Sequence, residues 1–275
     1  MPSANNAFTE FEHQGWQNVA NKYDSTWSSS TRQFIPPLLD AAEVGAKMSV
    51  LDVGCGPGYV SAAAAQRDAV PIGLDFSKEM LEIARQMFPS IEFREGDAQH
   101  LPFPDSTFDR VVANFALLHL ADPALACTEA CRVLKSGGKF AFTVWAPAAE
   151  SPYAKIIDDA IEAHATLDVD VPAGPPHHLY SGPEAFRKAL ASSGFDGDSV
   201  NFKLHTIQWE VPTARFVFDA ERNAGVRTAG LLARQTPEAL RAIQSAMEEA
   251  VRRYPKENGF AVPKTAYVVA VTKEN

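Results

Sequence analysis

A chain of 275 residues, of which 46% are hydrophobic and 21% charged, is long enough to bury a substantial core and has an ordinary globular composition. Its formal net charge of −9 argues against a protein that grips nucleic acid through a basic face. The sequence contains no apolar window that would span a bilayer and no signal-peptide pattern near its first residue, so we expect a cytoplasmic protein without a membrane span.

The first 48 residues are predicted to be mainly helical and carry several aromatic side chains, among them Tyr23. From residue 49 to residue 145, short β-branched runs alternate with helical patterns. Strands are predicted at 49–54, 69–76, 91–97, from 108, and at 139–145, and helices at 59–68, 77–88 and 122–138. Ser77 is placed to cap the second of these helices, Asp122 and Pro123 open the third, and Gly137 and Gly138 close it.

This alternation predicts βαβ units with a parallel sheet that is covered by helices on both faces. Beyond residue 145 the pattern loosens into loops. We then expect a capped helix at 179–195, a strand at 201–211, mainly helices at 213–256 and a final strand at 260–273. The segment 213–256 holds eight basic and five acidic residues. A solvated helix face is the default interpretation, and an anionic substrate or a partner surface is the alternative.

The three cysteines, Cys55, Cys127 and Cys131, have no zinc or disulfide spacing. Cys127 and Cys131 lie four residues apart, which places them on one helix face as buried thiols. We therefore expect reduced cysteines and no metal site.

The stretch GCGPG, residues 54–58, follows the first strand, where ligands of open α/β sheets bind. Gly54, Gly56 and Gly58 would let a ligand approach the backbone closely. A dinucleotide fingerprint needs a third glycine where this chain has Tyr59, and no phosphate-binding P-loop occurs. Asp52, two residues before Gly54, instead suits a ligand that bears an ammonium group.

The next two strands end in residues suited to a nucleoside. Asp75 stands where an acid accepts hydrogen bonds from ribose hydroxyls. Asp97 and the backbone of Ala98 are available to an adenine edge, and Phe76 and Met80 offer apolar faces to the ring. An amino-acid end, a ribose and an adenine in this order describe S-adenosylmethionine (SAM).

These motifs resemble those of the class I SAM-dependent methyltransferases, in the branch that includes the ubiquinone/menaquinone-biosynthesis enzymes and other small-molecule methyltransferases. LDVGCGPG and GLDFS are similar to the first two family motifs, and residues 96–123 and 132–145 to the following ones. The resemblance is close over about residues 14–145. It implies a Rossmann-like α/β fold with a seven-stranded, mostly parallel sheet, an antiparallel C-terminal strand and helices on both faces.

The resemblance also implies an organisation and a set of roles. Residues 1–48 would form a helical lid, 49–145 the SAM-binding core, and 146–275 the rest of a single structural domain, with 213–256 as a helical insertion on the substrate side. The cofactor contacts implied by position are Tyr23, Asp52, Gly54, Gly56, Gly58, Asp75, Phe76, Met80, Asp97, Ala98 and Asn114.

Several roles have structural alternatives. In the structural interpretation, Asp52 caps its own turn, Asp75 is a favourable charge at a helix N-terminus, and Tyr23 packs against neighbouring side chains without touching the cofactor. His119 is a candidate general base or part of the LLHL packing. Residues proposed for the acceptor pocket are Trp145, His177, His178 and Tyr180, each of which exposure or core packing would also explain.

The sequence therefore predicts an enzyme that transfers a methyl group from SAM to oxygen, nitrogen or carbon of a small-molecule acceptor and releases S-adenosylhomocysteine (SAH). A non-catalytic SAM-binding or scaffold subunit and an NAD-dependent oxidoreductase are the alternatives. The acceptor is the expected partner, with no nucleic acid, and a homodimer is compatible with the sequence.

Overall fold

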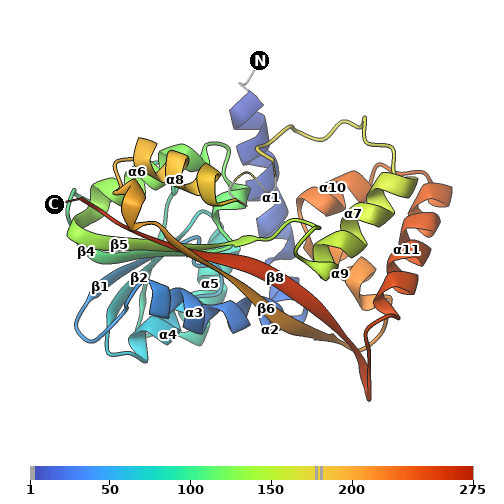
Figure 1. The fold of residues 1–275 in the computed structure, drawn as a ribbon, viewed down its shortest axis with the longest axis horizontal. Coiled ribbons are helices and arrows are strands. Elements are labelled where there is room, and N and C mark those ends of the chain that lie inside the picture. Colours follow the sequence, from blue (N-terminus) through green and yellow to red (C-terminus); the bar gives the residue numbers. More distant parts are fainter. Residues whose placement is uncertain (1–3, 177–178, 180–181, 275) are drawn as a thin grey trace.

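The computed structural model describes residues 4–176, 179 and 182–274. In this part of the chain one sheet of eight strands runs through the molecule in the order β3-β2-β1-β4-β5-β8-β6, with β7 paired to β8 outside this path (Figure 1). The strands are β1 (Ser49–Val53), β2 (Val70–Asp75), β3 (Glu92–Glu95), β4 (Phe108–Asn114), β5 (Leu134–Trp145), β6 (Asn201–Val211), β7 (Pro255–Lys256) and β8 (Gly259–Thr272).

The first five strands of the sheet are parallel, and β8 runs antiparallel between β5 and β6. The predicted seven-stranded, mostly parallel sheet with an antiparallel last strand is thus confirmed, and β7 adds only a two-residue hairpin arm. Val111, Val112 and Ala113 of β4 have no exposed surface, as expected for a central strand that is covered on both faces.

Helices cover both faces of the sheet (Figure 1). On one face α6 and α8 bury Phe140, Phe142 and Phe186, and on the other α3 and α4 bury Leu38 and Val60. The helices of the described residues are α1 (Ala4–Tyr23), η1 (Asp24–Ser28), α2 (Ser29–Thr31), η2 (Arg32–Phe34), α3 (Ile35–Ala41), α4 (Tyr59–Ala65), α5 (Lys78–Met87), η3 (Leu117–His119), α6 (Pro123–Val133), α7 (Pro152–His164), α8 (Pro183–Ser192), η4 (Gly197–Ser199), α9 (Phe216–Ala224), α10 (Arg227–Leu232) and α11 (Pro237–Val251).

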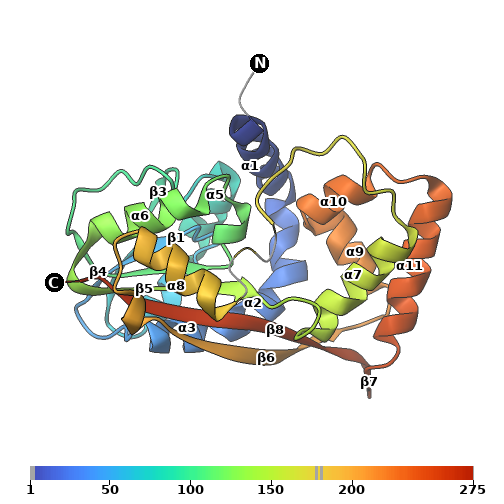
Figure 2. The ribbon, with the colours of Figure 1, turned by 45° about the horizontal axis from the view of Figure 1, so that its top comes forward.

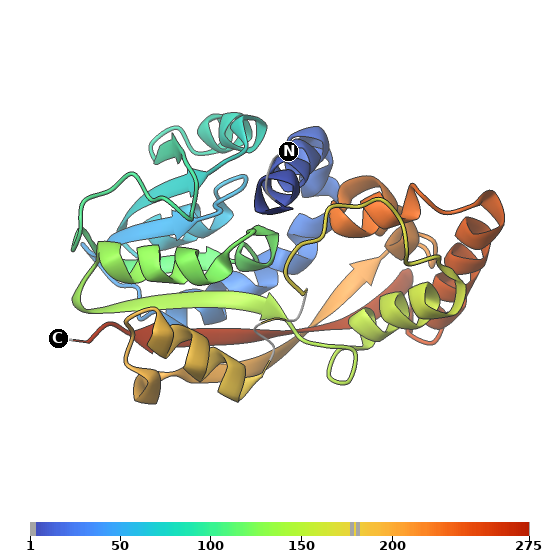
Figure 3. The same ribbon diagram turned by 90° about the horizontal axis from the view of Figure 1, so that it is seen from above.

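The long strands β6 and β8 extend beyond the parallel part of the sheet and carry a second group of helices, α7, α9, α10 and α11 (Figure 2). This group has its own apolar cluster, which includes Trp209, Phe218, Ile243 and Met247. Seen from above, α1 lies between the two groups of helices (Figure 3). Helix α1 packs closely against the segment between α9 and α10, because a Cβ placed on Gly15 would come within 2.4 Å of the Val226 side chain.

The helix starts predicted from capping residues agree with the structure. Ser77 accepts a hydrogen bond from the Met80 backbone at the start of α5, and Asp122 accepts one from Leu125 at the start of α6. The predicted end of α6 at Gly137 and Gly138 is wrong, because the helix ends at Val133 and both glycines lie inside β5. Leu134 is already extended and pairs with Phe108, ahead of a register shift between β4 and β5.

Candidate functional site

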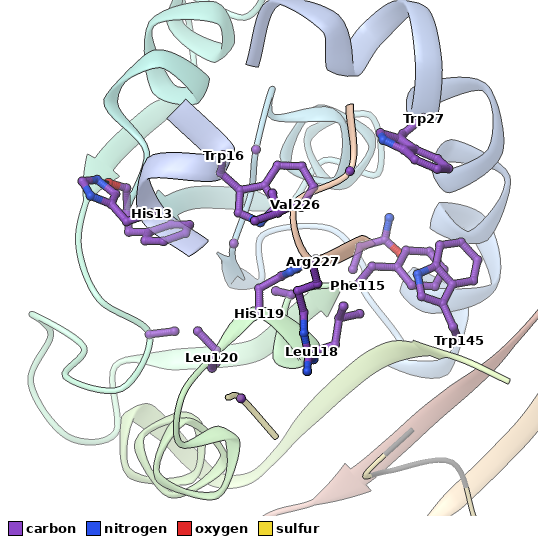
Figure 4. Close-up of a pocket in the computed structure, with 18 of the residues that line it drawn as sticks. His13, Trp16, Trp27, Phe115, Leu118, His119, Leu120, Trp145, Val226 and Arg227 are labelled. Carbon is purple, nitrogen blue, oxygen red and sulfur yellow. The ribbon is translucent and has the colours of Figure 1, made fainter. Parts of the chain in front are cut away.

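A large cavity lies at the carboxyl ends of β1, β2 and β4, between the sheet, α1 and the second group of helices. Its volume is about 1240 Å³. Figure 4 shows Trp16, His119 and Arg227 gathered near its centre, with His13 toward one end and Phe115 and Trp145 toward the other. The walls therefore come from segments that are far apart in the sequence.

The three glycines of the first turn have different surroundings, although all have positive φ, at 67°, 50° and 85°. A Cβ on Gly54 would come within 2.5 Å of Ala116, and one on Gly58 within 2.7 Å of Phe93. A Cβ on Gly56 would meet nothing within 4 Å. Gly54 and Gly56 line the cavity, whereas Gly58 begins α4 and serves its packing.

Asp52 orders this turn rather than facing the cavity. Its Oδ2 accepts hydrogen bonds from the backbone nitrogen (2.9 Å) and the hydroxyl (2.6 Å) of Ser61, which ties β1 to α4. Its side chain is buried, and Oδ1 has no hydrogen-bond partner among the described residues. Burial raises the pKa of Asp52 to about 7, although the bonds from Ser61 oppose this shift.

Asp75 lies at the carboxyl end of β2 and lines the cavity. One carboxylate oxygen accepts a hydrogen bond from the backbone of Gly56 (2.8 Å), and the other accepts one from the backbone of Ser77 (2.9 Å). Burial raises the pKa of this carboxyl, and the two backbone bonds oppose the shift. Asp75 thus couples the glycine turn to the start of the next helix, at the place predicted for ribose.

The residues predicted around adenine also line the cavity: Phe76, Met80, Asp97 and Ala98. His13 of α1, which sequence reasoning missed, lies with its ring 5.2 Å from that of Phe76 and its Nε2 3.1 Å from the Phe76 carbonyl oxygen. The N-terminal helix thereby reaches the side of the cavity that the sequence predicts for adenine.

Tyr23 and Asn114 both line the cavity, and both are hydrogen-bonded to Thr31. The Tyr23 hydroxyl is 3.0 Å from the Thr31 hydroxyl, and the Asn114 amide donates to the Thr31 carbonyl at 3.3 Å. Burial raises the pKa of Tyr23 to about 12. The helical N-terminus is therefore hydrogen-bonded to the end of β4.

His119 is paired with a buried acid that the sequence did not single out. Its Nδ1 is 3.0 Å from Oε2 of Glu12, and the Trp16 indole donates to the same oxygen at 3.1 Å. Glu12 is fully buried, and its Oε1 has no hydrogen-bond partner within the described segments. Both Glu12 and Trp16 come from α1, so this helix positions the candidate base.

The basic residues of 213–256 do not all lie on a solvated helix face as expected, and Arg227 is the exception. The side chain lines the cavity, lies over the ring of Phe8, and has a buried Nη1 without a hydrogen-bond partner among the described residues. Burial lowers its pKa, and the charge of Glu12 opposes this. Other basic residues of this segment, such as Arg215 and Arg241, do form exposed ion pairs within their helices.

At the end of the cavity predicted for the acceptor, Trp145 stacks on Phe115 with ring centres 3.7 Å apart. Tyr153 also lines the cavity and donates its hydroxyl to the buried Glu221. The other acceptor candidates, His177, His178 and Tyr180, lie outside the described residues.

A buried lysine completes this end of the cavity and was also missed. Lys264 of β8 is 1% exposed, and its ammonium lies over the rings of Trp27, Trp145, Tyr153 and Trp209, at 4.1 to 4.8 Å from their centres. Burial lowers its pKa to about 7, and Glu221 opposes this. The only signal in the sequence is a lysine in the interior of a final strand that is otherwise mostly apolar.

The described residues contain no cluster of three or more His, Cys, Asp or Glu side chains that could hold a metal ion. All three cysteines are free and buried. Among the helices of the described segments, none is long and apolar enough to cross a membrane.

Comparison with known proteins agrees with the geometry. A family described as "Methyltransferase domain" matches residues 51–142. A demethylmenaquinone methyltransferase of Renibacterium salmoninarum is 38% identical over 128 residues, which is 45% of this chain and 54% of the relative. One of Paenarthrobacter aurescens is 31% identical over 173 residues, which is 60% of this chain and 67% of the relative.

The matched stretch thus spans between about half and two thirds of these two relatives. The crystal structure of YcgJ from Bacillus subtilis superimposes with a TM-score of 0.57 at 21% identity, over 88% of this chain and 99% of that protein. This likeness concerns the fold.

Proposed function

Because this chain belongs to the class I SAM-dependent methyltransferases, we propose that it transfers a methyl group from SAM to a small-molecule acceptor and releases SAH. The observation that carries this proposal is Asp75, which lines the cavity at the end of β2 and holds the open glycine turn at Gly56. A cavity of about 1240 Å³ exceeds the usual size for one ligand, about 300–1,000 Å³, and so has room for a cofactor and an acceptor.

The residues present fit SAM. Asp75 would accept the ribose hydroxyls, and the open space at Gly56 would admit the methionine part along the turn. The adenine would lie against Phe76 and Met80, with Asp97 and Ala98 at its edge. Tyr23 and Asn114, already bonded to Thr31, would close the site from the N-terminal side.

Bound SAM supplies a methyl group on a sulfonium, which is already an activated leaving group. The protein then has to align the acceptor roughly 3–3.5 Å from that carbon and exclude water. Trp16 of α1 lines the cavity and is held by its hydrogen bond to the buried Glu12, so this helix would exclude water. Where the acceptor must lose a proton, His119 can accept it, with Nδ1–H held by Glu12 and Nε2 left as the base.

The acceptor is proposed to be flat and largely apolar. Trp145 stacks on Phe115 beside the end of β4, and Ile157, Ile161 and Leu231 extend the apolar wall. The relatives named demethylmenaquinone methyltransferase support an acceptor with a fused aromatic ring.

Calorimetric titration with SAM, SAH and NAD tests the cofactor assignment. We expect micromolar binding of SAM and SAH and none of NAD. A folded protein that binds neither SAM nor SAH would refute the proposal. Turnover of SAM with a panel of hydroquinones, phenols and amines then distinguishes an enzyme from a subunit that only binds the cofactor.

A further inference from the structure

The end of the cavity proposed for the acceptor contains a buried cation that has no oxygen partner among the described residues. Lys264 is 1% exposed and lines the cavity, and it makes no hydrogen bond or ion pair with any described residue. Burying a charged group raises the free energy of the folded state unless the group is paired, so other groups must stabilise this ammonium.

Four aromatic rings supply part of that explanation. The ammonium lies 4.1 Å from the ring centres of Trp145 and Tyr153, 4.5 Å from Trp27 and 4.8 Å from Trp209. Ring faces attract a cation, but they do not provide oxygen acceptors for the three hydrogen bonds that an ammonium can donate. The rings therefore hold the charge in place and leave its hydrogen-bonding capacity for something else.

The acid that acts electrostatically on Lys264 does not accept a hydrogen bond from it. Glu221 of α9 favours the charged form of Lys264, but its carboxylate accepts the hydroxyl of Tyr153 and forms no ion pair with the lysine. Tyr153 of α7 and Glu221 are the titratable groups that face Lys264 from the neighbouring helices.

The position of this cation relative to the cofactor turn follows from contacts already described. Gly54 of the turn packs against Ala116, directly after Phe115. Phe115 stacks on Trp145, and the Trp145 ring lies under Lys264. The ammonium is thus separated by one stacked pair of rings from the strand end toward which the methionine part would point.

We propose that Lys264 is a specificity-determining residue that binds an acidic oxygen of the acceptor, such as that of a phenol, an enol or a carboxylic acid on a flat ring. This inference rests on the proposed methyltransferase function and deepens it. The same geometry excludes cationic acceptors from this subsite, because the aromatic box that would take a methylated ammonium is filled by the chain's own ammonium.

The test uses 2-naphthoate and the uncharged 2-naphthamide, which have nearly the same shape, titrated calorimetrically into the whole protein saturated with SAH. We expect the wild-type protein to bind 2-naphthoate at least tenfold more tightly than 2-naphthamide. Lys264→Met, which keeps the box filled with an apolar chain of similar length, should abolish this preference and leave the SAH affinity unchanged. Lys203→Met on the exposed face of β6 is the matched control and should behave as wild type.

The wild-type comparison requires no mutant and therefore stands even where Lys264→Met unfolds. Equal affinity of the wild-type protein for the two probes, or no binding of 2-naphthoate to a protein that binds SAH, would overturn the assignment of Lys264. A preference that persists in a folded Lys264→Met variant would overturn it as well. Failure of the wild-type protein to bind SAH would instead refute the proposed function.

Discussion

Replacing Asp75 by Asn tests the proposed ribose site with the least change in shape. The carboxylate accepts hydrogen bonds from the backbones of Gly56 and Ser77, at 2.8 and 2.9 Å. An amide keeps one acceptor oxygen and presents an NH₂ group in place of the other, so one backbone N–H loses its acceptor. The remaining oxygen cannot also serve two ribose hydroxyls as an anion would.

The expected magnitude follows from the strength of hydrogen bonds to a charged group, about 1.5–3 kcal/mol each. Loss of one such bond to the cofactor corresponds to about 10- to 150-fold weaker binding of SAH. The fold should lose less, because removal of a buried charge offsets part of the lost backbone bond; burial raises the pKa of this carboxyl in the wild-type protein.

The assay is calorimetric titration with SAH, accompanied by thermal unfolding to show that each variant is folded. Asp105→Asn is the matched control, because Asp105 is an exposed acid whose partner is Arg132. We expect it to bind SAH as wild type does. An SAH affinity of folded Asp75→Asn within threefold of wild type would show that this carboxylate does not hold the ribose.

Three further outcomes follow from the site. Burial raises the pKa of Asp52 to about 7, so between about pH 4 and pH 7 the native state retains a proton that the unfolded chain has lost, and stability falls as the pH rises through this window. Asp52→Asn should flatten this dependence, by up to about 3 kcal/mol, between urea unfolding at pH 5 and at pH 8. Parallel pH profiles of the two proteins would contradict it. Gly58→Ala should lower the free energy of unfolding by about 2–4 kcal/mol, because Gly58 has a φ of 85° and an added Cβ would meet Phe93. Gly56→Ala should lower it by only about 1–2 kcal/mol and should chiefly weaken SAH binding. His119→Gln should lower kcat about 10²- to 10⁴-fold for an acceptor that must lose a proton, with SAH affinity unchanged, and an unaltered rate would assign His119 to packing.

The nucleotide-binding half could be predicted because its signals are local. The turn at Gly54–Gly58 and the acid at the end of β2 lie within short stretches whose spacing reflects one strand, one turn and one helix. Ser77 and Asp122 likewise cap helices that begin at the next residue. The prediction that Gly137 and Gly138 end α6 failed because it also relied on a local signal. Glycine occurs both at the end of a helix and at an irregularity inside a strand, and here the pair lies in the irregular part of β5.

The acceptor end could not be predicted because its partners are distant in the sequence. The box around Lys264 draws its rings from residues 27, 145, 153 and 209, and Glu12 lies 107 residues from His119. No periodicity connects such positions. Their proximity depends on how the N-terminal helices and the second group of helices pack against the strands, which is a property of the tertiary structure alone.

The pairing of β6 with β8 bears on how this protein family could change its substrates. The chain leaves the sheet at Val211 and returns opposite it at Phe260, so the two ends of the intervening segment are neighbours. A segment with adjacent ends can be lengthened, shortened or exchanged at small entropic cost, and the strands around it keep their register. Part of the cavity lining, including Glu221 and Arg227, lies on this segment. Recombination at a single hairpin would thus offer evolution, or an engineer, a new acceptor wall on an unchanged cofactor platform.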